Sequence, residues 1–217
     1  MTNTFTLTEG SCDCASVEHK IPLSIRIKSP KRNINCIRRM TIMVIGDPYK
    51  LSIIVKVLDK WNTSKYGKNG IFLFCIDGEL FPKQMDTAPV TVDLDALKRA
   101  FTDVTVNEEL YNADKVDAYT KMYNITFPKN IYSNYSYQYY IVAPTLYDND
   151  CFAFVVGNGT QIRVMVAEVG YEIKELRHDH DLNISEIYIT NDELCEILRE
   201  LDEVHQAILK ETACEVE

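Results

Sequence analysis

The 217-residue sequence has little of what an exported, membrane-spanning or disulfide-bonded protein needs. No window reaches the roughly 18 consecutive apolar residues of a membrane helix. The first residues contain neither a basic segment nor an apolar stretch, so we expect no secretory signal and a cytosolic location. The seven cysteines are scattered, with Cys12 and Cys14 as the only close pair, which favours reduced thiols over a disulfide framework.

Sequence motifs of catalysis are also missing. The chain has no G-x-S-x-G element and no P-loop, and no cysteine lies in a recognisable catalytic context. The segment Gly157-Asn158-Gly159 lacks the third glycine and the following helix of a dinucleotide site, and it is typical of a hairpin turn. We therefore predict no catalytic residue, no cofactor and no enzymatic activity.

One histidine-rich segment contains residue types that bind metals. In His178-Asp179-His180-Asp181, however, an extended backbone places only His178 and His180 on the same face, which leaves two ligands. Cys12, Cys14 and His19 also fall short of the four ligands of a structural zinc site. We predict no metal site, and a small metal-dependent enzyme that uses His178 and His180 stays an alternative.

Charge is unevenly distributed along the chain. The net charge is −9, yet residues 1–39 carry +4, so the remainder carries −13. Such acidity disfavours binding to nucleic acid, whose phosphates attract basic surfaces. It is compatible with solubility alone, or with attraction of a basic protein partner such as a nuclease-type domain.

The same change of charge suggests how the chain is divided. We predict that residues 1–39 form a basic N-terminal arm, which is either flexible or an extension ahead of an alternative start at Met40. Strong apolar patterning begins at Met40, and we expect one domain over residues 40–217.

Apolar runs separated by turn residues predict mainly strands. Runs at 41–45, 51–58, 71–77, 79–81, 151–156, 162–169, 171–176 and 184–189 favour strands, although 51–58 is also compatible with the start of a helix. Asp93 is a plausible N-cap for a short helix, Asn107 for a longer one, and Thr190 with Glu193 forms a capping box before a helix over about 191–210. These elements predict an α+β fold, a largely antiparallel sheet packed against two or three helices.

Two features are candidates for binding a partner protein. Tyr135, Tyr137 and Tyr139 alternate, so a strand would place all three on one face, where tyrosines often act as interface anchors. The final helix presents Glu196, Glu200 and Glu203, which could contact a basic partner. The alternatives are a half-buried sheet face for the tyrosines and a solvated helix face for the acids. We expect Trp61 to lie in the core, because a large aromatic buries much apolar area.

Several ordered segments resemble one protein family. They are Gly46-Asp47-Pro48-Tyr49, Trp61-Asn62, Asn69-Gly70-Ile71-Phe72, Ile76-Asp77-Gly78-Glu79-Leu80-Phe81-Pro82, Met122-Tyr123-Asn124-Ile125-Thr126-Phe127-Pro128, Tyr135-Ser136-Tyr137, Gly157-Asn158-Gly159-Thr160-Gln161-Ile162-Arg163 and Glu175-Leu176-Arg177-His178-Asp179. Over residues 40–210 the chain is similar to immunity protein 42, a family from bacterial polymorphic toxin systems.

That resemblance implies a non-enzymatic inhibitor that binds a cognate toxin domain in the cytosol. It names no toxin-contacting residue that can be transferred to this sequence. A regulatory module that self-associates through its C-terminal helix remains a further alternative.

Overall fold

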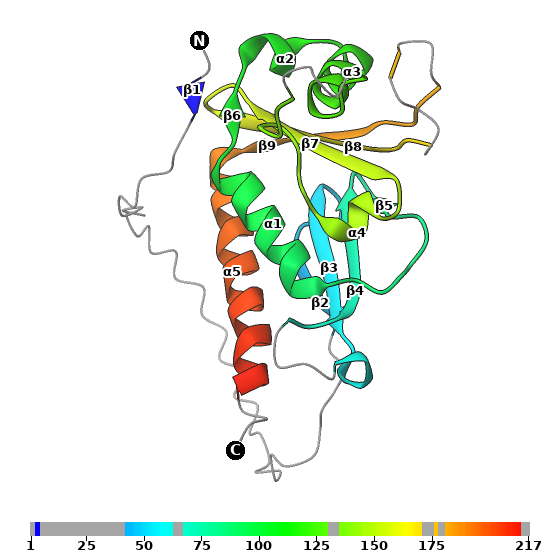
Figure 1. The fold of residues 1–217 in the computed structure, drawn as a ribbon. Coiled ribbons are helices and arrows are strands. Elements are labelled where there is room, and N and C mark those ends of the chain that lie inside the picture. The colour runs from blue at the N-terminus through cyan, green and yellow to red at the C-terminus, as the bar shows by residue number, and fades with distance from the viewer. Residues whose placement is uncertain are drawn as a thin grey trace, which may run out of the picture.

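The computed structural model describes residues 3–4, 42–62, 67–129, 135–170, 176–177 and 181–213. These residues form two mostly antiparallel sheets and five α-helices, including a long C-terminal one (Figure 1). The predicted α+β class is thereby confirmed. No helix in the described ranges is long and apolar enough to cross a membrane.

The first sheet contains four antiparallel strands in the order of the sequence. They are β2 (Met43–Gly46), β3 (Leu51–Val57), β4 (Gly70–Ile76) and β5 (Glu79–Phe81). Alternation of side chains turns one row inward, where Ile45, Ile53 and Phe74 are fully buried. Asp77 and Gly78 both have positive φ, 51° and 78°, which is the conformation of the two-residue hairpin predicted for this dipeptide.

The second sheet contains five strands in the order β1-β6-β7-β8-β9. They are β1 (Asn3–Thr4), β6 (Thr105–Val106), β7 (Cys151–Gly157), β8 (Gln161–Glu168) and β9 (Ser185–Thr190), and only β6 and β7 run parallel. All seven residues of β7 are buried because both faces of the sheet are covered. Side chains of β7 belong alternately to two apolar clusters, with Phe154 in one and Val155 in the other.

The helices are distributed between the two clusters. They are α1 (Val90–Thr102), α2 (Glu108–Asn112), α3 (Lys115–Thr126), α4 (Pro144–Tyr147) and α5 (Asn191–Ala213), and a 3₁₀ turn, η1, covers Asp59–Trp61. α1 and α5 lie side by side (Figure 1). The capping box before α5 is confirmed: the Thr190 amide donates to Glu193, and the Glu193 amide donates to Thr190.

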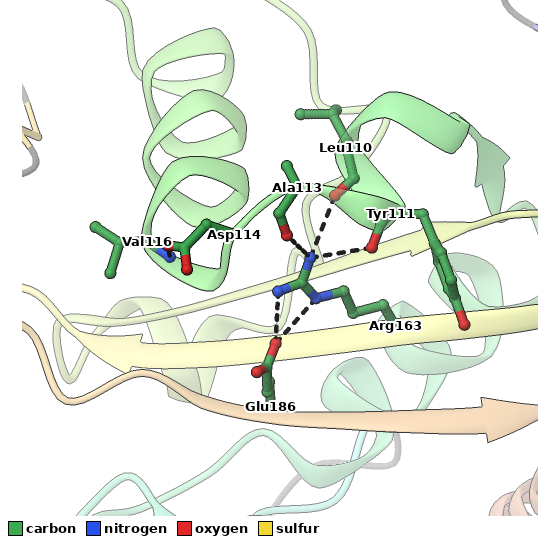
Figure 2. A network of polar contacts seen from close by, with 7 residues as sticks. All are labelled: Leu110, Tyr111, Ala113, Asp114, Val116, Arg163 and Glu186. Atoms are coloured by element: carbon green, nitrogen blue, oxygen red, sulfur yellow. Dashed lines mark hydrogen bonds and ion pairs between the residues drawn. The ribbon is translucent and has the colours of Figure 1, made fainter.

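The longer helix predicted from Asn107 is in fact two helices. Asn107 caps α2, and Asp114 accepts from the amide of Val116 to start α3. Arg163 of β8 explains the break, because its Nη1 donates to the carbonyls of Leu110, Tyr111 and Ala113 at 3.3, 3.1 and 2.7 Å (Figure 2). The guanidinium thus binds carbonyl groups that a continuing helix would have used.

Arg163 itself is anchored on the opposite side. Its Nε and Nη2 donate to Glu186 of β9 at 2.9 and 2.6 Å, and the arginine is only 1% exposed (Figure 2). A buried guanidinium requires this degree of pairing to offset its desolvation. The network therefore fixes the α2–α3 corner on the sheet.

Asp93 is not a helix N-cap, contrary to the sequence prediction. α1 begins at Val90, so Asp93 lies within its first turn and is fully buried. Its carboxylate accepts from the amide and the hydroxyl of Thr145 at 3.0 and 2.6 Å, which ties α1 to α4.

Candidate functional site

The tyrosine-rich segment runs along the edge of β7. The amide of Ile141 donates to Ala153, and the amide of Val155 donates to the carbonyl of Tyr139. Tyr140 forms an isolated bridge with Phe154, but residues 135–137 belong to no strand. The predicted strand through Tyr135, Tyr137 and Tyr139 is therefore wrong, because hydrogen bonding to β7 starts only at Tyr139.

This geometry separates the three predicted tyrosines. Tyr135 and Tyr137 are 60% and 53% exposed, and their rings pack edge to face with centroids 5.5 Å apart. Tyr139 is buried, and its hydroxyl accepts a hydrogen bond from the Asn107 side chain at 3.0 Å. Only Tyr135 and Tyr137 are therefore available to another molecule.

A groove of about 390 Å³ lies between this segment and α1. We call it the tyrosine groove; its lining comprises Ala96, Arg99, Ala100, Asp103, Tyr137, Gln138, Tyr140, Val142 and Val155. Most of the lining is apolar, and Val142 is exposed at its rim. The groove thus combines exposed aromatic rings with an apolar floor, as protein-binding surfaces often do.

Tyr140 connects the groove to a larger group of aromatic rings. Its ring lies 6.3 Å from that of Tyr137 and 5.2 Å from that of Phe127. Its buried hydroxyl has no hydrogen-bond partner among the residues that the structure describes. Burial raises the pKa of Tyr140, so the hydroxyl stays protonated.

The predicted carboxylates of α5 lie on a different part of the molecule. Arg199 forms ion pairs with Glu196 and Glu203, and the Arg199 side chain lowers the pKa of Glu196. Glu200 accepts a hydrogen bond from the amide of Gly46 in β2 at 2.7 Å. All three carboxylates therefore have partners within the chain, which weakens their attraction for a basic group of another protein.

Trp61 is not a core residue, contrary to the sequence prediction. It lies in η1 after β3 and is 45% exposed. The loop around it is held by polar groups instead: the Asn62 side chain donates to the carbonyls of Leu58 and Asn69. Trp61 thus becomes an exposed aromatic residue that could contact a partner.

The outer face of the four-stranded sheet is a second apolar surface, which the sequence reasoning missed. Val44, Ile54 and Leu73 lie opposite one another across β2, β3 and β4. Val44 is exposed, and the other two are half-buried. The sequence carried a signal for this surface, because consecutive residues of β2 and β4 are apolar, which makes both faces of each strand apolar.

The predicted metal-binding residue types are not tested by the structure. His178, Asp179, His180, Cys12, Cys14 and His19 lie outside the described residues. Within the described part of the chain, no group of three or more His, Cys, Asp or Glu side chains could hold a metal ion.

Comparison with known proteins identifies the class to which this fold belongs. A family model described as immunity protein 42 matches residues 43–204, so the chain belongs to the immunity protein 42 family. Proteins of this kind are typically non-enzymatic inhibitors with a cognate toxin as partner, which agrees with the prediction that the chain is not an enzyme.

A solved structure shows the same fold. The CdiI crystal structure from Burkholderia dolosa AUO158 has a TM-score of 0.57, is 19% identical, and matches 73% of this chain and 97% of its own. At that identity the likeness concerns the fold alone. A search of curated proteins finds no match to this chain.

Proposed function

We propose that this protein binds a cognate toxin domain in the bacterial cytosol and blocks its active site or a substrate-binding surface. Membership of the immunity protein 42 family is the observation that carries this proposal. The described surface supports it, because exposed aromatic rings border an apolar groove. The chain would act by occupying space on the toxin and would leave it chemically unchanged.

The tyrosine groove is the proposed anchoring surface. Tyr135 and Tyr137 are exposed and already packed against each other, so we expect little side-chain entropy to be lost when a partner covers them. Aromatic residues of this kind contribute about 2 kcal/mol or more each when they are central to an interface. Tyr139 is buried, and its hydrogen bond with Asn107 holds the end of the tyrosine segment in place.

The acidic surface is proposed to accelerate capture of a basic toxin, such as a nuclease-type domain. The net charge of −9 gives a long-range attraction for such a partner. Glu196, Glu200 and Glu203 would contribute to it, although Arg199 offsets part of their charge. We therefore expect these three carboxylates to raise the rate of association with the toxin, and we expect added salt to reduce that increase.

Co-expression tests the proposal directly. The cognate toxin domain, to be sought among the neighbouring genes, should stop growth when produced alone, and co-production of the wild-type chain should restore growth. Failure to protect, with both proteins present and folded, would contradict the proposal.

Affinity measurements with an inactivated toxin domain test the groove. Replacement of both Tyr135 and Tyr137 by alanine should weaken binding by at least tenfold. Tyr49→Ala is the matched control, because Tyr49 is 87% exposed on the β2–β3 turn and lies outside the groove lining. Equal affinities for the double variant and this control would place the interface elsewhere.

A further inference from the structure

A cleft of about 640 Å³ lies between the end of α3, the end of α4 and the start of β7. Its lining includes four aromatic residues, Tyr123, Phe127, Tyr147 and Phe152. Two carboxylates, Asp148 and Asp150, line it as well. Aromatic and acidic groups are thus combined in a single concave site.

The aromatic rings meet at steep angles. The ring of Phe152 lies 5.2 Å from Tyr123, 5.1 Å from Phe127 and 6.0 Å from Tyr147, with interplanar angles of 80°, 74° and 89°. Rings in this arrangement form walls and a floor rather than a flat stack. The negative faces of aromatic rings attract ammonium and guanidinium groups, most strongly where water is partly excluded.

The two carboxylates have no side-chain partner among the described residues. Asp148 is exposed and Asp150 is half-buried, and no hydrogen bond or ion pair is formed by either side chain within those ranges. Asp93 and Glu186, by contrast, are both hydrogen-bonded. A half-buried carboxylate without a partner is costly, so Asp150 favours the arrival of a cation or a donor.

The backbone holds Asp150 in place. Its φ of 54° is left-handed, its amide donates to Tyr147, and its carbonyl accepts from Val169 at 2.8 Å. Its carboxylate also acts on Tyr123 in the cleft lining. Burial is the main cause that raises the pKa of Tyr123, and the negative charge of Asp150 raises it further.

The charges of the cleft favour a positively charged occupant. The described lining contains one basic residue, Lys129, and two carboxylates, those of Asp148 and Asp150, so the carboxylates outnumber the basic group. An anionic ligand would face two carboxylates, and an apolar side chain would leave the Asp150 carboxylate buried without a partner. A basic side chain satisfies both the rings and the carboxylates.

We propose that this cleft receives a lysine or arginine side chain of the partner protein, held by cation–π contacts with the aromatic walls and by ion pairing with Asp148 and Asp150. The proposal rests on the proposed function for the identity of the partner. Tyr140 links the two sites through ring contacts, because its ring neighbours Tyr137 in the groove and both Phe127 and Phe152 in the cleft. A toxin anchored on the groove would reach the cleft with an adjacent segment.

A titration with a small probe tests the cleft without the toxin. Nα-acetyl-arginine amide is added to the ¹⁵N-labelled full chain up to about 50 mM, a range suited to a weak single-side-chain site. We expect saturable shifts of the backbone amides of Tyr147, Asp150 and Gly170. The citrulline analogue, which has the same shape but no charge, should leave these amides unshifted; equal shifts with both probes, or none with arginine, would overturn the proposal.

Two variants with matched controls assign the effect to the cleft. Asp150→Asn should weaken arginine binding about five- to tenfold, whereas Asp77→Asn should not. Both aspartates have positive φ, 54° and 51°, which asparagine also adopts, so both variants should fold. Tyr147→Ala should weaken binding similarly, and Tyr49→Ala should not. An Asp150→Asn variant that binds arginine as well as Asp77→Asn does would overturn the proposal.

The toxin provides a separate readout. If the wild-type chain binds toxin and Asp150→Asn binds it equally well, the cleft assignment fails while the proposed function stands. If arginine saturates the cleft but the toxin does not bind, the proposed function fails and the cation site stands.

Discussion

The Asp93→Asn substitution removes a buried carboxylate from α1 and leaves a side chain of the same shape. Asp93 is fully buried, and its polar partner is Thr145, which donates through its amide and its hydroxyl. Asparagine can still accept from the amide and can donate to the hydroxyl oxygen. The substitution therefore changes the charge with little change in packing.

The expected magnitude follows from the pKa of Asp93. Burial raises it from the ordinary 3.8 to about 6, and the hydrogen bonds from Thr145 oppose that rise without cancelling it. Because the folded-state pKa is above the unfolded one, the folded state binds the proton more tightly. Stability is then highest below about pH 4 and falls as the pH rises to about 6, by up to ~3 kcal/mol from this group.

Urea unfolding followed by circular dichroism between pH 4 and 8 measures this dependence. The stability of Asp93→Asn relative to wild type should rise by roughly 2–3 kcal/mol from pH 4 to pH 7.5. Asp95→Asn on the same helix is the control, because Asp95 is half-exposed and pairs with Arg99. A stability difference that is independent of pH, or that grows in favour of wild type, would refute the reasoning.

Two further substitutions test the packing. Arg163→Met should destabilise the fold by about 3–5 kcal/mol, because it leaves Glu186 and three carbonyls without their donor. Arg163→Lys should restore only part of this stability. A thermal melt of Arg163→Met equal to that of wild type would contradict the role of the network. Trp61→Ala should cost about 1 kcal/mol rather than the 3–5 kcal/mol of a buried aromatic, because the side chain is half-exposed; a larger loss in the same melt would place Trp61 in the core.

Elements with local signals were predictable from the sequence. The β4–β5 hairpin follows from an apolar run ending at Asp77-Gly78, and α5 follows from Thr190 and Glu193 with an apolar stripe behind them. In these cases the backbone conformation depends on residues that are close in the chain. The spacing of apolar residues and the residue types at the turns were therefore sufficient to predict these elements.

The failed predictions depend on distant residues. Asp93 is of a residue type that often caps helices, but it is buried and accepts a hydrogen bond from Thr145, which lies 52 positions away in the chain. The break between α2 and α3 depends on Arg163, about fifty residues further along the chain. Neither partner can be identified from a local window, so local preference gave the wrong helix boundaries.

The candidate site was predictable only in part. Alternation identified Tyr135 and Tyr137 as surface candidates, but it could not show that Tyr139 turns inward to Asn107. The cleft was missed because its aromatic and acidic residues come from two segments, residues 123–127 and 147–152, which lie about twenty residues apart in the chain. Only the fold brings Tyr123 beside Asp150.

Stoichiometric inhibition tests the central claim, that the protein acts by binding and not by chemistry. The activity of a fixed amount of the cognate toxin domain is measured while this chain is added in increasing molar ratio. Inhibition should be complete near one chain per toxin, and toxin recovered after dissociation should be fully active with unchanged mass. Inactivation of many toxin molecules by one chain, or recovery of a covalently altered toxin, would contradict the account.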